Sequence, residues 1–223
     1  MRRVTLVVFG LALFLASFAP IAVHAENSFE VSVGTSSVNE EGFDSAVKLG
    51  AEYLHRMGSS DVYFGFNAAT AEYKTEGGSM TTIPIGLVSR YQVPLEGKIK
   101  PYLSGGVAYY LNEAESPAIE DAVGMVNEFC YNAYFCPDFN LAAEINLKDT
   151  VGFHLGGGVD FYMTDRLILS LGAVYRIASA DLSVEITCSG GSCPTMVQDE
   201  IGVFSESVDL GGFDMNAGIK LLF

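Results

Sequence analysis

Residues 213–223, FDMNAGIKLLF, decide the fold of this chain. Apolar side chains occupy every odd position of the stretch, and polar or small residues such as Asp214 and Lys220 lie between them. Successive side chains of a β-strand point to opposite faces, so this strand would have one wholly apolar face. A membrane-spanning strand of a barrel needs only about 9–11 residues. The stretch therefore predicts a strand that faces lipid on one side.

The same alternation recurs along the chain toward its beginning. After the first 25 residues, no apolar run reaches the ~18–20 residues of a membrane helix. Because neighbouring strands of such a barrel run in opposite directions, an even number of strands leaves both chain ends on the same side of the membrane. We expect eight strands, within residues 29–33, 47–56, 62–68, 83–92, 103–109, 151–161, 167–177 and 213–223.

The connections between these strands fall into two classes. The short ones are residues 57–61, 94–99 and 163–166, and the longer ones are residues 37–44, 74–80, 112–149 and 182–207. Short turns on one side and long loops on the other are typical of outer-membrane barrels, whose long loops are extracellular. The sequence thus predicts an all-β fold, an eight-stranded antiparallel up-and-down transmembrane β-barrel of a bacterial outer membrane. Within the longest loop, residues 116–126 favour a short helix.

The terminal Phe223 separates this barrel from a soluble sandwich, which shows similar alternation. Outer-membrane barrels commonly present a last strand ending in Phe to their assembly machinery, so Phe223 is the expected assembly signal. Tyr and Phe near the strand ends fit the two aromatic girdles of such barrels.

The first 25 residues have the pattern of a secretory signal peptide. Arg2 and Arg3 precede an apolar core, and Ala25 offers a small residue for cleavage before Glu26. An uncleaved anchor is the alternative, which Pro20 disfavours. We expect a cleaved signal at residues 1–25, export through the periplasm and a barrel domain at residues 26–223.

The net charge of −15 excludes one class of partner. No basic stripe is present to neutralise phosphates, so nucleic acid is not expected. The expected partners are outer-membrane lipid and lipopolysaccharide. Acidic loop side chains would either bind divalent cations that bridge lipopolysaccharide or form a solvated surface.

Four cysteines lie in two close pairs, Cys130 with Cys136 and Cys188 with Cys193. In an exported chain such pairs predict two disulfides, and four cysteines allow three pairings. The local pairing is favoured because each ring is short. A zinc site would need histidines nearby, and His55 and His154 are distant in sequence, so no metal and no cofactor are expected.

Alternation places a set of side chains inside the barrel, where eight strands leave room for side chains or one small ligand. Charged residues at Glu52, Arg56, Arg90, Asp160 and Lys220 would form a network near the periplasmic side. This network would either close the lumen to ions or only satisfy buried charges. Above it, a less polar and roomier half would hold a small hydrophobic ligand, unless it is ordinary packing. Its residues are Val88, Gly106, Tyr110, Gly156 and Val174.

A hydrolase would need a nucleophile, a base and an acid brought together. His154 is the one histidine of the mature chain that lies well inside a strand, and alternation points it into the lumen. No Gly-x-Ser-x-Gly motif accompanies it, so we do not expect an enzyme.

Several segments resemble the OmpW family of small outer-membrane barrels. The resemblance lies in residues 83–87 (IPIGL) with Tyr91, 100–109 (KPYLSGGVAY), 156–165 (GGGVDFYMTD), 208–210 (VDL) and 213–223. It implies an eight-stranded barrel with a narrow lumen that passes small hydrophobic compounds across or into the outer membrane. The ending at residues 219–223 (IKLLF) and the cysteine-bearing loops differ from the family pattern. The competing hypothesis is a structural or adhesive barrel whose stapled loops bind a partner.

Overall fold

A computed structural model describes residues 27–132, 140–189 and 202–223 of the chain. The predicted signal peptide lies outside the described residues. The elements are β1 (Asn27–Ser36), β2 (Ala46–Arg56), β3 (Val62–Thr75), β4 (Gly78–Gln92), β5 (Ile99–Glu115), α2 (Pro117–Asn132), β6 (Asn140–Leu147), β7 (Thr150–Tyr162), β8 (Leu167–Ile177), β9 (Ser179–Ser189), β10 (Gly202–Asp209) and β11 (Gly212–Leu222).

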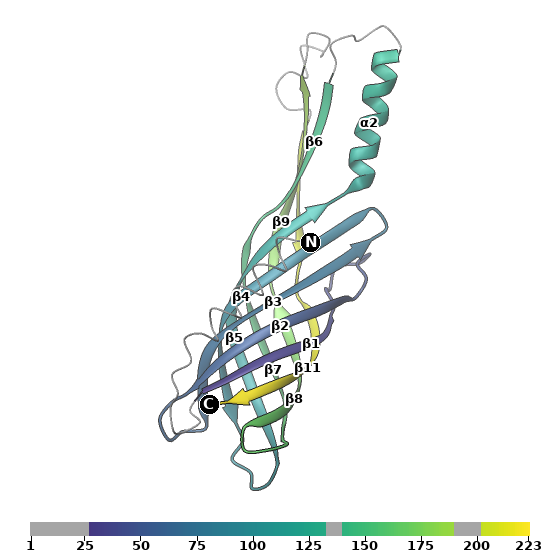
Figure 1. The fold of residues 1–223 in the computed structure, drawn as a ribbon. Helices are drawn as coiled ribbons and strands as arrows, with labels where there is room; N and C mark the ends of the chain where they lie inside the picture. The colour runs from purple at the N-terminus through teal and green to yellow at the C-terminus, as the bar shows by residue number, and fades with distance from the viewer. Residues whose placement is uncertain (1–26, 133–139, 190–201) are drawn as a thin grey trace.

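Eight of these strands close into an antiparallel barrel (Figure 1), in the order β1-β11-β8-β7-β5-β4-β3-β2. The first and last strands pair with each other from Ser28–Leu222 to Ser36–Asp214. At their ends, the backbones of Asn27 and Phe223 exchange two hydrogen bonds of 3.1 and 3.0 Å. The predicted fold class and the role of the closing strand in the barrel are confirmed.

The barrel wall follows the alternation of the sequence. On β11, Phe213, Met215, Ile219 and Leu221 are exposed, whereas Asp214 and Lys220 are buried in the lumen. The outward side chains of the other strands are also mainly apolar and exposed, for example Val31, Leu49, Phe66, Leu87, Leu103, Phe153 and Leu171. Such a belt is the surface that hydrocarbon chains cover in a transmembrane barrel.

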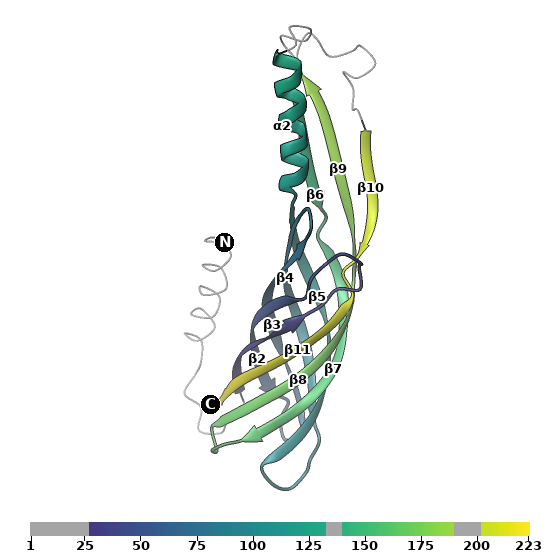
Figure 2. The same cartoon turned by 90° about the vertical axis from the view of Figure 1, so that its right-hand side faces the viewer.

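A second, three-stranded sheet rises above the barrel (Figures 1 and 2), in the order β10-β9-β6. Its strands continue β11, β8 and β7 after breaks of one or two residues, at 210–211, 178 and 148–149. We call these three strands with α2 the extension. The loops predicted at residues 112–149 and 182–207 therefore contain a sheet that alternation did not assign. Residues 74–80, which were predicted to be one of the longer connections, form a tight hairpin, because β3 ends only at Thr75 and β4 already begins at Gly78.

The helix α2 is longer than the predicted 116–126 and lies beside β6. It begins at Pro117, a residue whose fixed φ suits the first helical position, and the carbonyl of Ser116 accepts the amide of Glu120 at 3.3 Å. Ile119, Val123 and Asn127, spaced four residues apart, are its less exposed side. Within the ranges that the structure describes, no helix has the length and apolar character needed to cross a bilayer.

Candidate functional site

Five charged side chains meet in the lower, periplasmic half of the lumen, and we call them the lower charge cluster. Arg90 lies at its centre, with Nη2 2.7 Å from Glu52 Oε1 and 3.5 Å from Glu30 Oε2. Lys220 Nζ lies 2.7 Å from Asp160 Oδ2 and 3.5 Å from Glu30 Oε2. The guanidinium of Arg90 also stacks 3.9 Å above the ring centre of Tyr102. Buried charges are stable in such a space only when they are paired in this way.

The cluster differs in two members from the charged network predicted from the sequence. Glu52, Arg90, Asp160 and Lys220 lie together as expected from their inward positions. Arg56 does not join them: it is half-exposed and bonds Asp61 at 3.3 Å, because it is the last residue of β2 and reaches the turn below. Glu30, which was not singled out, takes its place.

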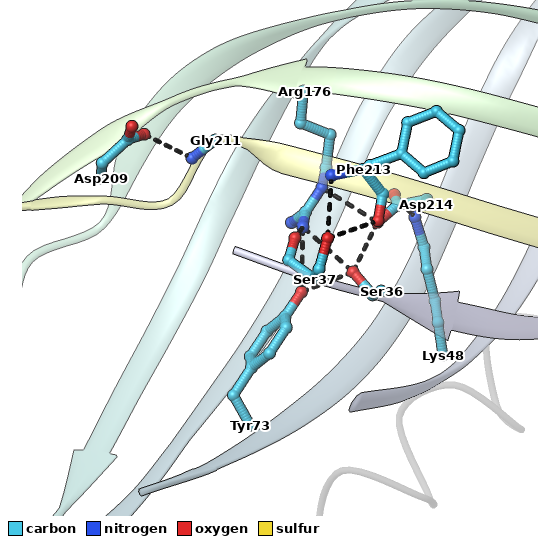
Figure 3. A network of polar contacts seen from close by, with 9 residues as sticks. All are labelled: Ser36, Ser37, Lys48, Tyr73, Arg176, Asp209, Gly211, Phe213 and Asp214. Atoms are coloured by element: carbon cyan, nitrogen blue, oxygen red, sulfur yellow. Dashed lines mark hydrogen bonds and ion pairs between the residues drawn. The ribbon is translucent and has the colours of Figure 1, made fainter. Parts of the chain in front are cut away.

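A second network crosses the lumen nearer the extracellular side (Figure 3), and we call it the upper polar cluster. Asp214 Oδ1 lies 3.1 Å from Arg176 Nε, and its Oδ2 lies 2.5 Å from Lys48 Nζ. Ser36 Oγ donates to Asp214 at 2.5 Å, and Tyr73 OH lies 2.6 Å from Ser36 Oγ. Lys48, Arg176 and Asp214 each alternate with apolar residues in their strands, as lumen-facing residues do, but without strand register nothing in the sequence shows that they meet.

The two clusters enclose a cavity of about 90 Å³, which we call the lumen chamber. Three uncharged side chains of its wall carry buried polar atoms without a hydrogen-bond partner in the described part of the chain, namely Asn67 Oδ1, His154 Nε2 and Asn216 Oδ1. The chamber therefore lies between two sets of charged side chains, and its wall presents both polar and apolar groups.

The residues predicted to line a ligand path surround this chamber only in part. Val88, Tyr110 and Val174 line it. A Cβ on Gly106 would lie 2.1 Å from the carbonyl oxygen of Leu87, and one on Gly156 would lie 2.3 Å from that of Ala173. The two glycines lie where the backbone of a neighbouring strand approaches closely, and the chamber wall also holds Lys48, Arg176 and Asp214. A role of these five residues in a ligand path stays a prediction.

Apolar side chains fill the barrel above the upper polar cluster. This apolar cluster comprises Ala46, Ala71, Tyr73, Met80, Ala108, Tyr110, Leu147, Ala178, Ala180, Val208 and Leu210. Above it lies a cavity of about 220 Å³, the apolar pocket, between the β3–β4 hairpin, the start of α2 and the sheet of the extension. Its walls include Phe43, Ile119, Ile145, Leu182 and Val184, and Met80, Leu147 and Val208 belong to both the pocket and the apolar cluster. The apolar pocket and the apolar cluster are therefore continuous.

The barrel wall has a break in its hydrogen-bond ladder beside these layers. β3 and β4 pair at Ala68–Ile85 and again at Ala71–Thr82. Between these two pairs, residues 69–70 of β3 and residues 83–84 of β4 form no ladder pair with each other. Pro84 has no N–H to donate. Ala69 and Pro84 line the lumen chamber, so the break lies between the chamber and the lipid-facing surface.

The remaining predicted residues lie apart from these layers. Phe223 is half-buried and its ring centre lies 6.5 Å from that of Tyr53, while its role as an assembly signal stays a prediction. Cys188 on β9 is disulfide-bonded, but Cys136 and Cys193 lie outside the described residues, so the pairing also stays a prediction. His154 faces the lumen, as alternation predicted. The described ranges hold no group of three or more His, Cys, Asp or Glu suited to a metal ion.

A closed eight-stranded barrel with an apolar outer belt defines a class, the small β-barrel proteins of the bacterial outer membrane. The crystal structure of the outer membrane protein OprG from Pseudomonas aeruginosa is similar, with a TM-score of 0.63, 14% identity, and coverage of 89% of this chain and 96% of that chain. Neisserial surface protein A gives a TM-score of 0.55 at 12% identity, covering 88% and 96% of the two chains. The Outer Membrane Protein W of E. coli gives 0.51 at 15% identity, covering 91% and 100%.

No family model and no curated protein sequence matches the chain. At these identities the solved structures show a common fold. The location in the outer membrane follows from the closed barrel of this chain and the apolar belt on its outside.

Proposed function

We propose that this barrel takes up small apolar molecules at its extracellular side and releases them sideways into the outer membrane, without catalysis. The observation that supports this most directly is the apolar pocket of about 220 Å³, which is continuous with the apolar cluster below it. Ligand pockets of this kind are concave and lined mainly by apolar side chains. The class of ligand follows from the lining, which offers few polar groups to a guest.

The lower layers of the lumen favour a sideways exit over passage through the barrel. Below the apolar cluster a guest would have to displace Arg176 from Asp214, and further down Arg90 from Glu52. Separating buried ion pairs in this way is costly. The ladder break at residues 69–70 and 83–84 is followed directly by Ala71, which belongs to the apolar cluster, so a guest held in that cluster would reach the break without separating either ion pair.

The resemblance of the sequence to the OmpW family supports the same role, because members of that family are linked to passage of small hydrophobic compounds. The TM-score of 0.51 with the E. coli protein is consistent with this assignment. We propose membership of the OmpW family, with lipid, lipopolysaccharide and the barrel assembly machinery as partners.

Uptake of the apolar dye N-phenyl-1-naphthylamine by intact Gram-negative cells tests the proposal. Ala114 lies on the pocket wall, so Ala114→Trp would fill much of the pocket with an indole. Cells that produce the original protein should take up the dye faster than cells with an empty vector. Cells that produce the variant should take it up at the background rate.

The matched control is Ala122→Trp, which adds the same side chain to an exposed position of α2 away from the pocket. It should leave uptake unchanged at equal surface abundance. Uptake no faster than in empty-vector cells, or equal loss in both variants, would contradict the proposal.

A further inference from the structure

The two edges of the sheet in the extension differ in how they are covered. Along one edge, β6 is accompanied by α2, and the side-chain amide of Asn127 bonds both backbone groups of Leu141. Asn127 Nδ2 donates to the Leu141 carbonyl at 2.9 Å, and the Leu141 amide donates to Asn127 Oδ1 at 2.7 Å. Asn127 thus takes the place of a neighbouring strand, and the helix covers the edge.

The opposite edge belongs to β10, which pairs only with β9 among the described strands. The pairing runs without a bulge through eight consecutive residues, from Gly202–Ile186 to Asp209–Ser179. Only the lower end of this edge is covered in the described chain, where the amide of Asp209 donates to Glu40 Oε2 at 3.1 Å. An open edge of this kind is a template for another strand.

Proteins usually protect such edges with Lys, Pro, a bulge or a very short strand. β10 has the sequence GVFSESVD, which contains neither Lys nor Pro. Its one large apolar side chain, Phe204, is 68% exposed. An extended edge with an exposed aromatic anchor is the surface that peptide recognition by strand addition uses.

The charge of the sheet indicates what kind of strand it accepts. Its three strands hold five acidic residues and neither Lys nor Arg, the acids being Glu144, Asp181, Glu185, Glu206 and Asp209. Glu144 and Glu185 stand directly opposite each other, a like-charge pair that destabilises a sheet. Pairing this acidic edge with the same edge of a second copy would add repulsion between carboxylates. Pairing it with a basic strand would reduce the repulsion among the carboxylates of the sheet.

We propose that the open edge of β10 binds an extended, basic peptide segment as a fourth strand of the extension. Side-chain alternation sets the pattern, because Phe204 and Glu206 lie on one face of β10. The partner residue opposite Phe204 is apolar, and the residue opposite Glu206, two positions away, is Lys or Arg. Backbone hydrogen bonds supply affinity, and the charges supply selectivity.

Fluorescence anisotropy with the full barrel in nanodiscs tests this inference. The probe is a dye-labelled peptide with the repeat Val-Val-Lys-Lys, in which residues two positions apart are always one Val and one Lys. Its two comparison forms are the same peptide with alternate backbone amides methylated, and a peptide in which Glu replaces Lys. The original peptide should bind about tenfold more tightly than the methylated form, since methylation removes several ladder hydrogen bonds. The Glu peptide should not bind.

Two variants with equal change of net charge locate the site. Glu206→Lys, on the edge, should weaken binding of the Val/Lys peptide by about fivefold or more. Glu120→Lys, on an exposed position of α2, should change it less than about twofold. Circular dichroism of both variants checks that the fold is kept.

Three results would overturn the inference. Equal binding of the methylated peptide would show attraction by charge alone, without strand addition. Equal weakening by the two variants would place the peptide elsewhere. Dimerisation of the barrel that blocks the peptide would identify a second copy as the occupant.

Discussion

Charged side chains occupy the lower half of the lumen, and Arg90 lies at their centre. It contacts three carboxylates, those of Glu30, Glu52 and Asp160, at 3.5, 2.7 and 3.7 Å. Its removal would leave the carboxylates of Glu30, Glu52 and Asp160, the first and last of them buried, with only Lys220 to balance them. By contrast, Arg56 contacts one carboxylate near the solvent.

Arg90→Ala should lower the free energy of unfolding by about 3–5 kcal/mol, since it leaves buried carboxylates unpaired. Arg56→Ala should cost about 1 kcal/mol or less, as expected of an exposed pair. Urea unfolding in detergent micelles, followed by far-UV circular dichroism because the chain has no Trp, measures both. Equal unfolding midpoints for the two variants would show that the lower charge cluster does not stabilise the barrel.

At the level of elements, the attachment of α2 to the sheet depends on one polar contact and a narrow apolar stripe. Asn127→Leu removes both hydrogen bonds to Leu141 but keeps a side chain of similar size. Each bond is worth about 0.5–1.5 kcal/mol, so the Leu141 amide should exchange with solvent about tenfold faster. Hydrogen exchange measured by NMR checks this. Glu128→Gln, on an exposed position of the helix, is the control and should leave the rate unchanged.

The barrel strands could be predicted from the sequence, but the strands of the extension could not. Apolar residues such as Leu182, Val184 and Ile186 alternate in β9 just as they do in the wall. Because β9 follows β8 after one residue, the pattern alone gives no reason to divide or extend the strand. The pairing of β6 with β9 joins segments about 40 residues apart, which no local signal specifies.

The sequence could predict which residues of the candidate site face the lumen, but not the height at which each of them lies in the barrel. Alternation assigned Lys48, Arg90 and Asp214 to the lumen, since a period of two fixes the face of each side chain. The height of each residue in the barrel depends on strand register, which sets Arg176 near Asp214 and away from Asp160. For this reason the upper polar cluster and the apolar pocket appeared only in the structure.

On the scale of the whole molecule, the apolar belt fixes the depth of the barrel in the bilayer. Leu171 lies near the middle of β8 and Leu167 at its first residue, and both face lipid. A lipid-facing Arg destabilises a barrel by about 2–4 kcal/mol at the bilayer midplane and by about 0–1 kcal/mol near the interface. Leu171→Arg should therefore destabilise the barrel clearly more than Leu167→Arg. Guanidinium unfolding from lipid vesicles measures the difference, and equal costs would contradict this placement in the membrane.

The direct continuation of the barrel strands into the extension has a consequence for reach. The eight residues of β10, at about 3.4 Å per residue, give the extension a length of about 27 Å. β9 follows β8, and β6 and β10 precede β7 and β11, in each case with only one or two residues between them. The extension is therefore a direct continuation of the barrel wall (Figure 2). It carries its outermost residues well beyond the rim of the barrel. A large partner could therefore contact those residues without approaching the rim itself.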